Sequence, residues 1–153
     1  EWPGWSLAAL WIAFGVIGSI GNVFLGNSLR SKPGAGAVPN RVETAAWIGV
    51  NAGLMSYVAG VVLGVTTGKL EPVFFNTILP VALVGYGAVW TILAQIAGQK
   101  LFYLPGVAAL IGAAACVVTV TTAEVYLIAA ATALASSFLP GVIFLMREPG
   151  DVV

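Results

Sequence analysis

The stretch WIGVNAGLMSYVAGVVLG, residues Trp47–Gly64, decides the fold class of this chain. It holds no charged residue, and its small residues recur every three or four positions. At about 100° per residue on an α-helix, these small residues share one stripe. The stripe consists of Gly49, Gly53, Ser56, Gly60 and Gly64. Such a stripe lets the backbone of another helix approach closely within a bilayer. The stretch therefore predicts a membrane helix that packs through its glycine face.

The composition of the whole chain is that of a membrane protein. Its mean hydropathy is +1.01 and only 8% of its residues are charged, which does not fit a soluble globule. Six basic and six acidic residues balance, so no nucleic-acid partner is indicated. The chain starts at Glu1 without a methionine, and we interpret residues 1–153 as a single polytopic domain, processed or truncated from a longer chain. We expect it in a bacterial inner membrane.

Apolar runs separated by polar loops predict an all-α integral membrane protein, a bundle of five transmembrane helices. Each run is long enough to cross a hydrocarbon core of about 30 Å at about 1.5 Å per residue. The expected spans are residues 5–27, 44–67, 72–98, 101–121 and 125–146. Pro80 and Pro140 lie within the third and fifth spans and predict kinks there, because proline removes a backbone hydrogen bond.

The distribution of basic residues predicts the orientation of this bundle. With the N-terminus outside, most basic residues are cytoplasmic and only Lys69 is external. The cytoplasmic set is Arg30, Lys32, Arg41, Lys100 and Arg147. Because cytoplasmic loops are enriched in Lys and Arg, we expect the N-terminus outside and the C-terminus in the cytoplasm.

The first span carries a second stripe of small residues with the spacing found in Trp47–Gly64. It consists of Gly15, Ser19, Asn22 and Gly26. The two stripes are natural partners, since each removes side chains from a contact surface. A contact within one chain and a contact between subunits need the same small residues, so the spacing is equally consistent with a homo-oligomer or with other membrane subunits.

No catalytic or metal-ligand constellation is found in the sequence. The chain has no histidine, and its lone cysteine, Cys116, lies in an apolar helix where a packing role is expected. Every carboxylate lies at or outside a predicted helix end. We therefore expect neither an enzyme nor a bound cofactor or metal.

Uncharged polar residues within the spans are the remaining candidates for a site. If they converge, they would line a small cavity able to hydrogen-bond a neutral or zwitterionic solute. These candidates are Asn51, Gln95, Tyr86, Asn22 and Tyr57. The alternative is that they join helices through hydrogen bonds, each contributing about 0.5–2 kcal/mol.

Two functions follow from these patterns. The first is a non-catalytic multi-pass module, a subunit or membrane domain that associates through glycine- and alanine-rich helix faces. The second is a transporter or channel for a small uncharged or zwitterionic solute, with the bends at Pro80 and Pro140 permitting gating. An integral membrane enzyme is disfavoured because a base, a nucleophile and a metal set are all lacking.

Overall fold

The computed structural model describes residues 16, 20, 23, 24, 38–140, 142 and 143. By their contacts the residues of the chain separate into two units, Glu1–Arg41 and Val42–Val153. The second unit holds nearly all of the described residues and is the one considered below. The first predicted span, with the stripe Gly15, Ser19, Asn22 and Gly26, lies outside the described residues.

The glycine-rich stretch forms part of α2, the helix Val38–Thr66. This helix begins several residues before the predicted boundary at residue 44, so part of the expected loop is helical. Pro39 lies in its first turn, where the missing N–H of proline would be unpaired in any case. The helix ends in a turn at Gly68, whose φ of 69° is in the left-handed region that glycine tolerates.

The third predicted span consists of two kinds of helix. A 3-10 helix, η1, covers Pro72–Thr77, and the α-helix α3 follows over Ile78–Ala97. Pro80 therefore lies in the first turn of α3, next to a change of helix type. Its missing N–H is tolerated at that position. Gly98 ends the helix with a φ of 62°.

The fourth and fifth spans are described over shorter α-helices than the sequence predicts. A 3-10 turn η2, Lys100–Phe102, leads into α4, Tyr103–Val118. The helix α5 covers Glu124–Ala133 and continues as the π-helical turn η3, Leu134–Phe138. The N–H of Leu139 donates to the carbonyl of Leu134, five residues back, directly before Pro140. The π-helical turn thus lies next to Pro140, where the sequence predicts a kink. The kink itself stays a prediction.

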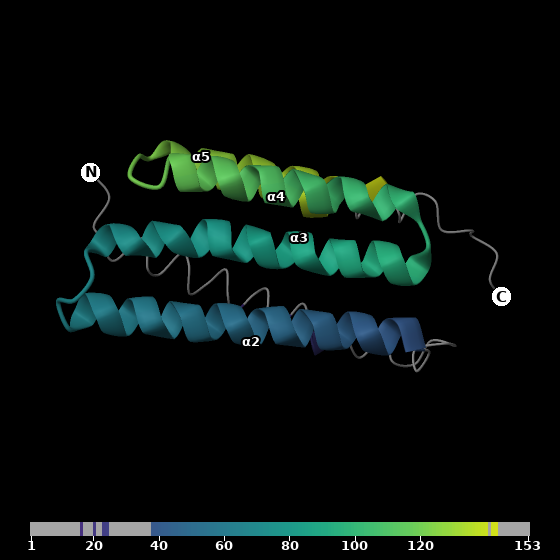
Figure 1. Ribbon diagram of the computed structural model, residues 1–153, viewed down its shortest axis with the longest axis horizontal. Coiled ribbons are helices and arrows are strands. Elements are labelled where there is room, and N and C mark those ends of the chain that lie inside the picture. Colours follow the sequence, from purple (N-terminus) through teal and green to yellow (C-terminus); the bar gives the residue numbers. More distant parts are fainter. Residues whose placement is uncertain (1–15, 17–19, 21–22, 25–37, 141, 144–153) are drawn as a thin grey trace. The chain divides into compact units, whose positions relative to one another are not determined.

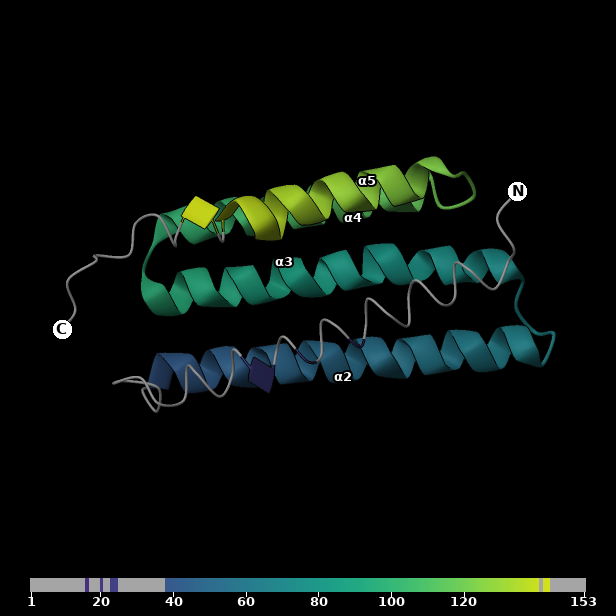
Figure 2. The ribbon, with the colours of Figure 1, turned by 180° about the vertical axis from the view of Figure 1, so that it is seen from behind.

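The four helices run up and down as hairpins, with α3 between α2 and α4 and with α5 beside α4 (Figures 1 and 2). The core lies among α3, α4 and α5. Its buried residues are Leu83, Ala113, Cys116 and Val125. Cys116 is fully buried in this core, as its apolar surroundings in the sequence predict.

Close helix contacts occur where glycine removes a side chain. A Cβ atom on Gly87 of α3 would lie 3.2 Å from the carbonyl oxygen of Gly106 on α4, so the two backbones nearly touch. On the other side of α4, a Cβ on Gly112 would overlap the side chain of Thr132 on α5. Small-residue packing therefore holds α3, α4 and α5 together.

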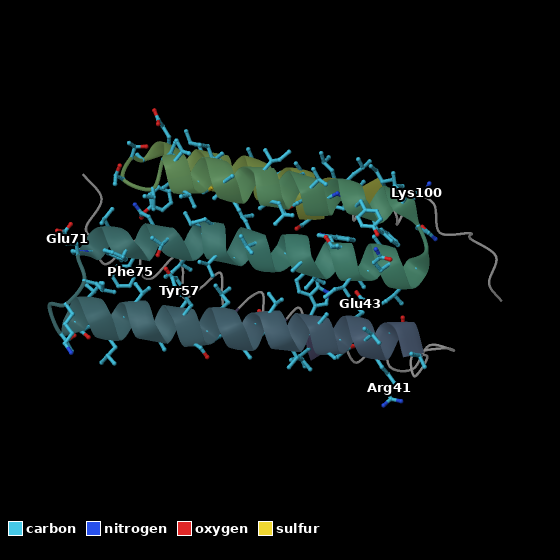
Figure 3. The ribbon with its side chains drawn as sticks, viewed as in Figure 1. Arg41, Glu43, Tyr57, Glu71, Phe75 and Lys100 are labelled. Carbon is cyan, nitrogen blue, oxygen red and sulfur yellow. The ribbon has the colours of Figure 1, made fainter. Side chains whose placement is uncertain are left out.

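The described residues confirm the helical fold class, while the number of five spans stays a prediction. Three helical segments are long and apolar enough to cross a bilayer: Asn40–Thr66, Pro72–Ala97 and Lys100–Val118. Charged side chains lie at the ends of the unit, with Glu43 and Lys100 at one end and Glu71 at the other (Figure 3). Between these ends the described helices are uncharged, so their apolar surfaces are suited to contact with lipid.

Candidate functional site

A polar network joins η1 to the turn between α4 and α5. The Asn76 Nδ2 donates to the carbonyl of Val120 at 2.8 Å, and the Tyr126 hydroxyl donates to Asn76 Oδ1 at 2.6 Å. Asn76 is partly buried, whereas Tyr126 is exposed. The amide of Asn76 thus connects η1 to a turn more than forty residues further along the chain. These contacts lie at the same end of the unit as Glu71.

A second hydrogen bond at this level connects α2 to η1. The hydroxyl oxygens of Tyr57 and Thr77 lie 2.7 Å apart. The Thr77 hydroxyl also donates to the carbonyl of Phe74, so its single hydrogen is used. Tyr57 is therefore the donor to Thr77. Figure 3 shows Tyr57 between α2 and α3.

An open groove extends from this hydrogen bond between α2, α3 and α4. Its volume is about 550 Å³. The lining residues are Tyr57, Thr77, Pro80, Val81, Val84, Leu110, Ala113, Ala114, Val117 and Val120. Apart from the hydroxyls of Tyr57 and Thr77, the lining side chains are apolar, and none is charged. The groove is the candidate site of the described unit.

The polar residues predicted from the sequence do not gather around this groove. Of the four candidates that the structure describes, only Tyr57 lines it. Asn51 is exposed and donates to the carbonyl of Trp47 on its own helix at 2.8 Å. The ring of Tyr86 packs edge-on against Trp47, with ring centroids 5.1 Å apart. Gln95 is exposed and Asn22 lies outside the described residues, so a shared role in binding a solute stays a prediction.

The predicted glycine stripe of α2 faces away from α3. A Cβ placed on Gly49, Gly53 or Gly60 would meet no atom within 4 Å, while one on Gly64 would meet Leu70. Ser56 is exposed as well. The helix uses larger side chains instead, with Trp47 packing on Tyr86 of α3 and Tyr57 bonding to Thr77 of η1. The predicted partner of the stripe is therefore not among the described residues of Val42–Val153.

Sequence reasoning did not identify the network around Asn76. Asn76 was not among the predicted candidates, and no partner was predicted for it. A signal was present in retrospect, since Asn76 and Thr77 are adjacent polar residues that follow an apolar pair. Their partners, Val120 and Tyr126, could not be read from the spacing because they lie on the far side of a helix hairpin.

No family model, curated protein or solved structure matches this chain. Within the described residues, no group of three or more His, Cys, Asp or Glu side chains is placed to hold a metal ion. The class of protein is therefore inferred from the helical fold and from the apolar surfaces of the helices. The chain is a helical membrane protein with an apolar groove, and no described residue lies within 4 Å of a Cβ placed on Gly49, Gly53 or Gly60.

Proposed function

We propose that this chain is a non-catalytic multi-pass membrane module that associates with a further helix through the glycine face of α2. The proposal rests on Gly49, Gly53 and Gly60, since a Cβ placed on any of them would meet none of the described residues within 4 Å. Three glycines on one exposed face would let the backbone of a partner helix approach closely. Lipid chains make fewer van der Waals contacts with such a surface than a helix that fits it.

The low burial of α2 supports the same proposal. Only 6% of its span is buried, compared with 28% and 33% for the spans that contain α3 and α4. Among the described residues of α2, Val61 alone is buried. The described residues therefore cover little of α2, and van der Waals packing is a principal source of helix association in lipid.

Association is tested by the mass of the protein in detergent. We expect the wild type to form a defined oligomer or a complex with another membrane subunit. Replacing both Gly53 and Gly60 with leucine should abolish the complex, because the side chains would fill the space that a partner backbone needs. Light scattering on the purified protein measures the mass.

A matched control adds the same side chain to another side of the helix. Ala59→Leu lies about 100° from Gly60 around α2 and is also exposed. The control should associate like the wild type. A wild type that is monomeric and has no co-purifying protein, or a double leucine variant that associates normally, would contradict the proposal.

We further propose five spans in a bacterial inner membrane, with the N-terminus outside. The described hairpins support this arrangement, since Lys69 follows α2 at one end and Lys100 precedes α4 at the other. A cysteine at Lys69 should react with a membrane-impermeant maleimide in intact cells, whereas one at Lys100 should react only after lysis. The reverse labelling pattern would overturn the orientation. Cys116 is buried and serves as the unreactive background.

A further inference from the structure

We draw no further inference here: the strongest candidate, the open apolar groove between α2, α3 and α4, is the candidate site already described, and nothing in the described part of the chain shows what covers it.

Discussion

Replacing Gly112 with leucine is expected to prevent α4 and α5 from packing and to leave little folded protein. A Cβ atom at this position would already overlap the side chain of Thr132, whose own Cβ lies 2.7 Å away. Thr132 is buried, so it cannot turn aside into lipid. Overpacking of a filled core costs about 1–3 kcal/mol and more where nothing can move. We expect at least the upper part of that range.

The measurement is the free energy of unfolding in a denaturing-detergent titration, together with the yield of monodisperse protein. Ala59→Leu is the matched control, because it adds the same side chain at an exposed position of α2 outside the glycine face. It should unfold like the wild type within about 0.5 kcal/mol. If Gly112→Leu is as stable as Ala59→Leu, the close contact between α4 and α5 is wrong.

Asn76→Leu is expected to produce the second largest loss of stability. The substitution removes the donor to the Val120 carbonyl and the acceptor for the Tyr126 hydroxyl. Interhelical hydrogen bonds in membrane proteins contribute about 0.6 kcal/mol on average and up to about 1.7 kcal/mol. Losing two should cost about 1–3 kcal/mol in the same unfolding titration. Tyr126→Phe, which breaks one of the two, should cost about half as much.

Asn51→Leu provides the control for loss of an amide. The Asn51 side chain donates to the carbonyl of Trp47 on its own helix and is exposed. Its removal should leave the free energy of unfolding nearly unchanged. Equal losses for Asn51→Leu and Asn76→Leu would contradict the assignment of the network to Asn76. The same variant also tests solute binding, because a transporter that uses Asn51 would lose solute-induced swelling in liposomes.

Much of the fold could be predicted from local patterns. Helical spans follow from apolar runs of sufficient length, and their ends follow from Gly98, Pro72 and the charged residues between runs. The early start of α2 was missed because Arg41 and Glu43 resemble a loop, although both fit a helix that extends beyond the hydrocarbon core. The change of helix type before Pro80 was also missed, since proline is compatible with either pattern.

The site could be predicted only in part. Tyr57 was chosen for its depth in the membrane, and it does line the groove. Asn76 received no role because its partners lie in the turn after α4 and on α5, far from it in sequence. The groove itself has no sequence signal, since its lining of valine and alanine resembles any lipid-facing surface.

The sequence by itself determined that the chain is helical, that its helices suit a membrane and that the small residues of Trp47–Gly64 share one face. These properties depend on hydrophobicity and on the helical repeat, which are local. Only the tertiary structure decided that α2 turns Trp47 and Tyr57 toward α3 and leaves Gly53 open. Which side of a helix meets a neighbour depends on the shapes of both surfaces, and the periodicity of one helix contains no information about the other.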